Sequence, residues 1–176
     1  MEQKQALIYG FAEEGELVCR ALEGLGIAPR VVAPEEMGQQ VGYLCGLPGY
    51  REKKKAPALT VDRAMILFHN LTRDELDEAL KALHNGGVTR TSLKAMVTPT
   101  NSGWPMAKLL GEIHQEQQVM GELMKLSRLR KGVTPDPFNF PLMQALMQAE
   151  KCFSGGEELT VEQVRKAYAA LEAALK

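Results

Sequence analysis

Residues 64–83 read AMILFHNLTRDELDEALKAL, and this stretch decides the fold. The run Ala64 to Phe68 is short and apolar, which is typical of a buried strand. Thr72 starts a helix whose apolar residues recur at the spacing of one helical face: Leu76, Ala79, Leu80 and Leu83. Asn85-Gly86-Gly87 ends that helix, and Leu93 to Val97 is a second strand. The stretch and its continuation therefore predict a strand-helix-strand (βαβ) unit.

The same order of elements occurs earlier in the chain. A strand is predicted at Ala6 to Phe11, a helix at Glu16 to Leu25 and a second strand at Ile27 to Ala33. The two halves were compared by pairing residues 6–25 with 64–83 and residues 31–46 with 96–111. This pairing gives ten identities in thirty-six positions, where composition alone gives roughly two or three. We therefore predict an internal duplication.

Two tandem βαβ units bury their apolar faces most simply in one four-stranded sheet with both helices on one side. This ferredoxin-like arrangement is an α/β fold, an α+β sandwich. Each unit ends in a turn with proline and then glycine, Pro34 and Gly38 in the first and Pro99 and Gly103 in the second, before a further helical stretch. A minimal ferredoxin-like domain lacks that additional helix.

The C-terminal third is predicted to be helical. We expect a duplicated βαβ domain over residues 1–104, a long amphipathic helix over 105–131 and a helical hairpin over 132–176. Thr160 and Gln163 have the spacing of a capping box at the start of the last helix. The hairpin is too small to be stable unless it docks on something. The long helix exceeds the usual globular length, which favours a homodimer through this helix or through a sheet edge.

Composition limits the classes of partner. Twenty-one basic and twenty-two acidic residues leave a net charge of −1, so nucleic acid is disfavoured as a partner, and no apolar run is long enough for a membrane span. Three widely spaced cysteines are typical of reduced thiols, which favours a cytoplasmic protein. No residues have the spacing of a metal site, and Gly10, Gly24 and Gly26 do not match the GxGxxG pattern of a nucleotide loop. No cofactor and no metal are therefore predicted.

One candidate site follows the last strand of the second unit, in Val97 to Pro105, VTPTNSGWP. Pro99 and Gly103 have counterparts in the first half, which indicates a turn that both units need. The first half has no counterpart for Thr98, Thr100, Asn101 and Trp104, and Lys94 and His69 lie close to them in the predicted sheet. These six residues are the predicted ligand-binding site. A structural interpretation competes with it, in which Asn101 or Ser102 caps a helix and Trp104 fastens that helix to the core.

Residues Leu93 to Trp104, followed by Leu109 to Ile113, resemble a bacterial family known only as domain of unknown function 3783. The resemblance covers residues 64 to about 116 and includes the lysine-alanine pair, the Thr-x-Thr-Asn-x-x-Trp run and the helix after it. The first half departs from this pattern. Since the family has no established activity, the resemblance implies an α/β unit and no particular reaction.

Three functions are compatible with these patterns. The absence of a nucleophile-base pair favours a non-enzymatic module that binds a small ligand or a protein, with no catalytic residue assigned. The alternative is a small-molecule enzyme whose pocket includes Lys94, Thr98, Thr100 and Asn101. RNA binding on a sheet like that of an RNA-recognition motif has less support, because it needs exposed aromatic residues such as Tyr9 and Phe68 on the strands.

Overall fold

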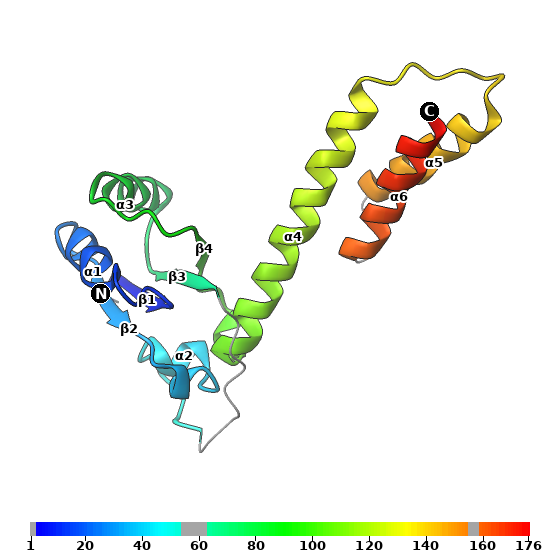
Figure 1. Ribbon diagram of the computed structural model, residues 1–176. Helices are drawn as coiled ribbons and strands as arrows, with labels where there is room; N and C mark the ends of the chain where they lie inside the picture. The colour runs from blue at the N-terminus through cyan, green and yellow to red at the C-terminus, as the bar shows by residue number, and fades with distance from the viewer. Residues whose placement is uncertain (1–2, 54–62, 155–158) are drawn as a thin grey trace. The chain divides into compact units, whose positions relative to one another are not determined.

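The computed structural model describes residues 3–53, 63–154 and 159–176 (Figure 1). Its elements in chain order are β1 (Gln5–Tyr9), α1 (Gly15–Glu23), β2 (Ala28–Val31), the 3-10 helix η1 (Pro34–Glu36), α2 (Val41–Leu44), β3 (Ala64–His69), α3 (Arg73–Asn85), β4 (Ser92–Met96), the 3-10 helix η2 (Asn101–Gly103), α4 (Met106–Lys131), α5 (Phe140–Phe153) and α6 (Val161–Ala174). The chain divides into two compact units, Met1–Ile113 and His114–Lys176. Helix α4 contributes residues to both.

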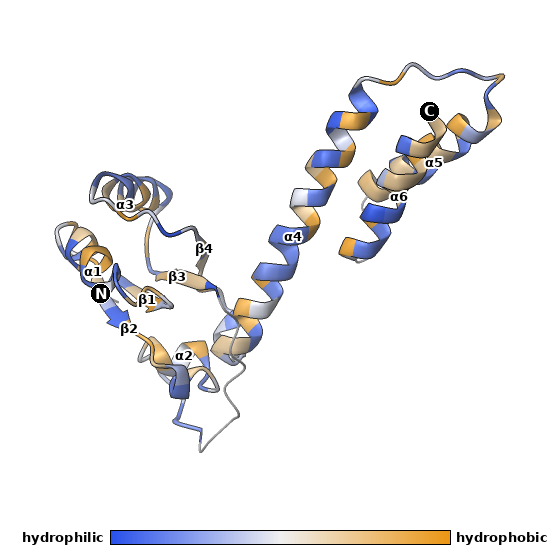
Figure 2. Ribbon diagram, viewed as in Figure 1, coloured by the Kyte–Doolittle hydropathy of each residue, from blue (hydrophilic) through white to orange (hydrophobic). Residues whose placement is uncertain are grey.

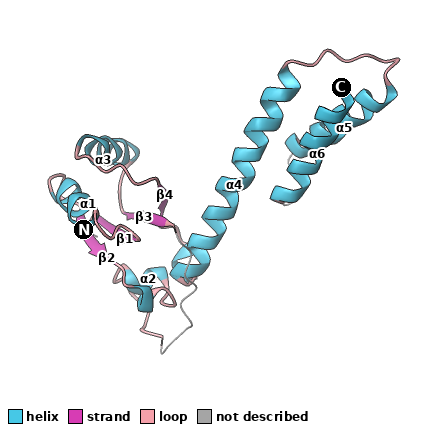
Figure 3. Cartoon of the chain, in the orientation of Figure 1, coloured by secondary structure: helices cyan, strands magenta, loops and turns pink. Residues whose placement is uncertain are grey.

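The first unit is a mixed α/β unit with a four-stranded sheet in the order β2-β1-β3-β4 (Figure 3). Strands β1 and β2 are parallel, β3 and β4 are parallel, and β1 and β3 pair antiparallel. The ferredoxin-like strand order that the sequence suggested was wrong. In a split βαβ fold another strand lies between the two strands of a unit, whereas here the two strands of each unit are direct neighbours.

Helices cover both faces of this sheet. Helices α1 and α3 pack on the face of Ile8, Ile66 and Phe68. The opposite face, with Leu7 and Leu67, is covered by α2 and the first turns of α4. Strands buried on both faces need apolar residues at successive positions, as β1 and β3 have (Figure 2). The helices that follow the proline-glycine turns supply this second layer.

The registers relate the two halves of the sheet. In the pairing of the halves by sequence, Ile8 corresponds to Ile66 and Gln40 to Pro105. In the structure, Ile8 is the antiparallel partner of Ile66, and an isolated antiparallel bridge joins Gln40 to Pro105. A twofold relation between the two halves brings equivalent residues together in this way. The duplication itself stays a prediction.

The second unit packs the later turns of α4 against α5 and α6. Its buried residues include Leu126 of α4, Ala149 of α5, and Val164 and Leu171 of α6. The hairpin that the sequence predicts thus docks on its own chain. Alanines at 145, 149 and 167 let the helices approach closely. Residues 155–158, which separate α5 from α6 in the sequence, lie outside the described residues.

Side-chain caps define where the helices of the second unit begin. The Asn139 side chain accepts a hydrogen bond from the Leu142 amide at 3.1 Å and so caps α5. Thr160 and Gln163 form the predicted capping box of α6.

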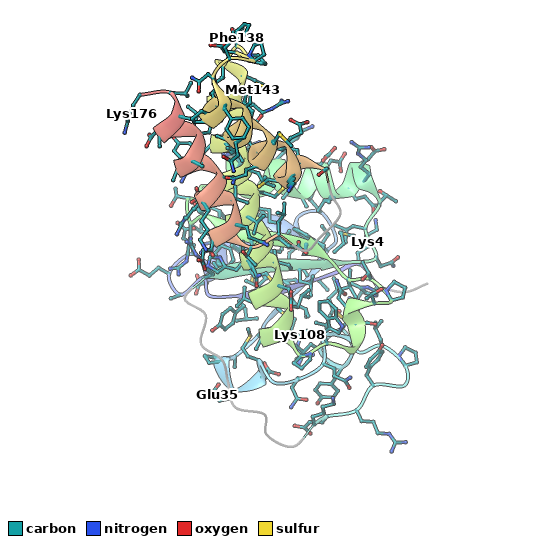
Figure 4. The ribbon with its side chains drawn as sticks, turned by 90° about the vertical axis from the view of Figure 1, so that its right-hand side faces the viewer. Lys4, Glu35, Lys108, Phe138, Met143 and Lys176 are labelled. Carbon is teal, nitrogen blue, oxygen red and sulfur yellow. The ribbon has the colours of Figure 1, made fainter. Side chains whose placement is uncertain are left out.

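Figure 4 shows Phe138 on the loop that connects α4 to α5, where its side chain is 96% exposed. In the described parts of the chain, every helix is too short or too polar to cross a bilayer.

Candidate ligand-binding site

The polar groups of the predicted site residues Thr98 and Asn101 form a turn. The Asn101 side chain accepts from the Thr98 amide at 2.8 Å and donates to the carbonyl of Met96 at 3.0 Å. The Thr98 hydroxyl accepts from the Asn101 amide at 3.2 Å. Each of the two residues thus caps the backbone of the other. This network joins the end of β4 to η2.

Of the other four predicted residues, Thr100 and Trp104 flank η2, whereas Lys94 lies on β4 and His69 on β3. Trp104 is half-buried against the core, and the Lys108 ammonium lies 4.3 Å from the centroid of its ring. The Lys94 ammonium donates to the Ser92 carbonyl at 3.3 Å, and Thr100 is exposed. His69 ends β3, the neighbour of β4. Their role in ligand binding stays a prediction.

A contact that the sequence did not reveal fixes the same turn. The Tyr50 hydroxyl lies 2.8 Å from the Ser102 hydroxyl, which also donates to the Pro99 carbonyl at 2.9 Å. The Tyr50 ring lies against Gly42, where a Cβ would come within 2.5 Å of it. Glycine at position 42 is therefore what allows this ring to reach Ser102.

A pocket of the first unit lies at the opposite end of the strands from this turn. This pocket of about 1050 Å³ opens where β1 and β2 end and α1 begins. Since β1 and β3 run antiparallel, the carboxyl ends of β1 and β2 lie opposite those of β3 and β4. The lining is Ile8, Tyr9, Gly10, Phe11, Ala12, Gly15, Glu16, Cys19, Arg20, Val31, Val32, Pro34, Arg63 and Arg90. None of the six predicted site residues is among them.

The loop from β1 to α1, residues 10–14, forms one wall of this pocket. Gly10 has φ of 80°, and a Cβ there would lie 3.0 Å from the Ala64 Cα and 3.1 Å from the Arg63 carbonyl oxygen. Glycine is required because the left-handed backbone also passes close to another strand. The Phe11 side chain then turns inward and is 4% exposed.

Glu14 holds this loop to the loop between α3 and β4. Its carboxylate accepts hydrogen bonds from the Thr89 hydroxyl, the Thr89 amide at 3.1 Å and the Arg90 amide at 3.0 Å. The Thr89 hydroxyl, followed by the Arg90 amide, lowers the pKa of Glu14. Glu14 therefore stays ionised and keeps Arg90 at the pocket.

Glu14 is also the residue before α1, and its side chain does not cap that helix. By contrast, the side chains of Thr72 and Thr160 cap α3 and α6. The first amides of α1 adjoin the pocket through Gly15 and Glu16. The positive end of the helix dipole is thus directed at the same space.

The thiol in this pocket is not activated. Burial raises the pKa of the Cys19 thiol, and the carboxylates of Glu23 and Glu16 raise it further. Burial also raises the pKa of Cys45 to about 11. A catalytic thiol needs a lowered pKa, so Cys19 is an apolar part of the wall. In residues 3–53, 63–154 and 159–176, no cluster of three His, Cys, Asp or Glu residues could hold a metal ion.

The aromatic residues of the central strands are covered. Tyr9 is 9% exposed and Phe68 is fully buried. Base stacking on a sheet needs exposed rings on the middle strands. These two rings instead belong to the cores on the two faces of the sheet.

The comparison with known families matches one segment of the chain. Residues 64–120 match the domain of unknown function DUF3783. The match confirms the resemblance, and it covers about a third of the chain. No curated protein and no solved structure matches the chain. All six predicted site residues lie inside the DUF3783 segment, whereas the pocket lining lies outside it except for Arg90.

The sequence carried one signal for the pocket that its interpretation missed. The apolar run predicts a strand that continues to Phe11, whereas β1 ends at Tyr9 and Gly10 begins the βα loop, a position where ligand sites often form. The GxGxxG spacing is absent here, so the glycine pattern does not predict a nucleotide loop. The positive φ and the close approach to Ala64 are tertiary features that the spacing test does not detect.

Proposed function

We propose that the unit Met1–Ile113 is a non-enzymatic binding module that takes a small molecule into the pocket at the ends of β1 and β2. The observation that carries the proposal is the pocket itself, about 1050 Å³ in volume and walled mainly by apolar side chains. Small-molecule sites occupy roughly 300–1,000 Å³ and lie outside the carboxyl ends of strands in open α/β sheets. The volume and the position both fit such a site.

The exposure of Val31 supports this proposal. Val31 is the last residue of the edge strand β2, and its apolar side chain is 62% exposed within the lining. An apolar ligand that covered this side chain would remove it from water at a favourable free energy of about 25 cal/mol per Å². The raised pKa of Cys19 favours binding over thiol chemistry.

The test is a screen of small apolar and amphipathic compounds by thermal shift on the full chain. We expect at least one class to raise the melting temperature, and Val31→Asp to abolish the shift, because a carboxylate would enter the apolar wall. Leu25→Asp is the matched control, since Leu25 is also exposed, at 38%, and does not line the pocket. If Val31→Asp left all shifts unchanged, the proposal would fail.

The runner-up is a small-molecule enzyme around Lys94, Thr98, Thr100 and Asn101. It has less support, because the Asn101 amide group and the Thr98 hydroxyl already bond the backbone of their own turn. RNA binding on the sheet has the least support, since Tyr9 and Phe68 are buried.

We also propose that the chain forms a homodimer through α4. Met120 and Met124 lie one turn apart on α4 and are 57% and 55% exposed. Flexible thioethers suit adaptable protein contacts. Light scattering should give the mass of two chains for the native protein and of one chain when both methionines are replaced by lysine. A native mass of one chain would contradict the proposal.

A further inference from the structure

The pocket at the ends of β1 and β2 has an uneven charge. Its lining includes the cations Arg20, Arg63 and Arg90, whereas Glu16 is the single carboxylate among its described residues. The chain as a whole has a net charge of −1, so this positive excess is local. The uncapped amino end of α1 has the same sign.

The apolar and cationic parts of the lining come from different elements. Ile8, Val31 and Val32 lie on β1 and β2 or directly after β2, and Phe11 lies on the loop after β1. Arg63 directly precedes β3, and Arg90 lies on the loop before β4. A ligand that used the whole pocket would therefore meet apolar side chains with one part and guanidinium groups with another.

The carboxylate of Glu14 limits how far Arg90 can move from the pocket. It accepts the backbone amide of Arg90, which fixes the main chain at that position, and the charge of Arg90 contributes to the lowered pKa of Glu14. The Arg20 Nε donates to the Glu16 carbonyl at 3.4 Å, a long hydrogen bond that an anion can displace. A guanidinium binds a carboxylate or sulfonate through two parallel hydrogen bonds.

We propose that the ligand is an amphipathic anion, with an apolar ring or chain that covers Val31 and one carboxylate-like group that binds Arg20 and Arg63. This inference rests on the proposed function of the pocket and specifies its ligand class. The exposed arginines and the mainly apolar walls suit one anionic group better than a polyphosphate, which would need donors throughout the site.

The test compares two probes that share one aromatic body. 1-Anilinonaphthalene-8-sulfonate carries a sulfonate, and N-phenyl-1-naphthylamine is the same molecule without it. Binding to the full chain is measured by titration, and the site is located by the amide NMR signals of Gly10 and Gly15. We expect the anionic probe to bind about tenfold more tightly, which is the scale of one charge-assisted hydrogen bond.

Charge-removing variants identify the groups that bind the anion. Arg20→Gln and Arg63→Gln should each reduce the preference for the anionic probe, and together they should make the two affinities equal. Arg73→Gln is the matched control, because Arg73 is an exposed arginine in the first turn of α3 and outside the lining. Inorganic phosphate, an anion without an apolar body, should bind at least tenfold more weakly than the anionic probe.

The outcomes separate this inference from the proposed function. If both probes shift the signals of Gly10 and Gly15 with equal affinity, the pocket binds small molecules and the anionic class is overturned. If neither probe shifts those signals, both the inference and the proposed function fail. A preference for the anionic probe that persists in the double variant would also overturn the assignment to Arg20 and Arg63.

Discussion

The two halves of the first unit use the same order of elements and finish their strands differently. Strands β1 and β3 are both followed directly by a residue of positive φ, Gly10 at 80° and Asn70 at 57°. After β3, the short loop leads into a helix that Thr72 and Glu75 cap at once. After β1, the longer loop crosses to Thr89, and α1 begins without a side-chain cap. The pocket lies beside the loop after β1, at the ends of β1 and β2.

The turn after β4 and the turn after β2 also differ in their contacts. After β4, Thr98, Asn101 and Ser102 bond their own backbone, and Tyr50 closes over Ser102. After β2, the Glu36 carboxylate accepts the Ala33 amide at 3.0 Å and binds the Arg30 guanidinium at 2.8 Å. The polar residues of the turn after β4 thus hydrogen-bond the backbone of that turn. Residues that differ between the two halves of a repeat are therefore not by themselves evidence of a ligand-binding site.

The largest expected effect comes from Gly10. Gly10→Val places a β-branched side chain at φ of 80° with backbone atoms of Ala64 and Arg63 near 3 Å from its Cβ. We expect a loss of about 1–3 kcal/mol in the free energy of unfolding, measured by urea denaturation. Gly15→Ala is the control, because a Cβ there meets nothing within 4 Å. A fully stable Gly10→Val protein would show that the wall of the pocket is not fixed by this residue.

The second effect tests the structural role of the turn after β4. Asn101→Ala removes the bonds to the Thr98 amide and the Met96 carbonyl and should cost about 1 kcal/mol of stability. Binding of probes in the pocket at β1 and β2 should not change. If Asn101→Ala left the stability unchanged and abolished binding of a ligand, the turn after β4 would be a binding site. The two halves would then not differ in the way described above.

The smallest effect concerns the Glu14 contact and depends on pH. The Thr89 hydroxyl and the Arg90 amide lower the pKa of Glu14 in the folded protein below its unfolded value. The stability that this carboxylate contributes is therefore present above the unfolded pKa and is lost as the pH falls through the folded pKa. Melting curves between pH 7 and pH 3 measure this dependence.

Glu14→Gln should remove part of that dependence and lower the melting temperature slightly at pH 7. Glu13→Gln is the matched control, since it removes the same charge from the neighbouring residue. If the melting temperatures of Glu14→Gln and the native chain depended on pH in the same way, the loop after β1 would be held by contacts other than the Glu14 carboxylate.

Much of the fold could be predicted because local patterns encode it. Apolar runs predict the strands, helical spacing predicts α1 and α3, and Thr160 with Gln163 predicts the start of α6. The strand order could not be predicted in the same way. The sheet pairs β1 with β3 and is covered on its second face by α2 and α4, and these are contacts between segments far apart in the chain.

The sequence by itself determined that the chain builds strand-helix-strand units and a helical hairpin, because hydrophobic periodicity and capping residues act over a few positions. Only the tertiary structure decided where a ligand could bind. The pocket combines a loop after β1, the residue before β3 and the loop before β4. The Glu14 carboxylate joins the first of these loops to the last by accepting the Thr89 amide. No local pattern reports such distant contacts, because the antiparallel pairing of β1 and β3 brings these segments together.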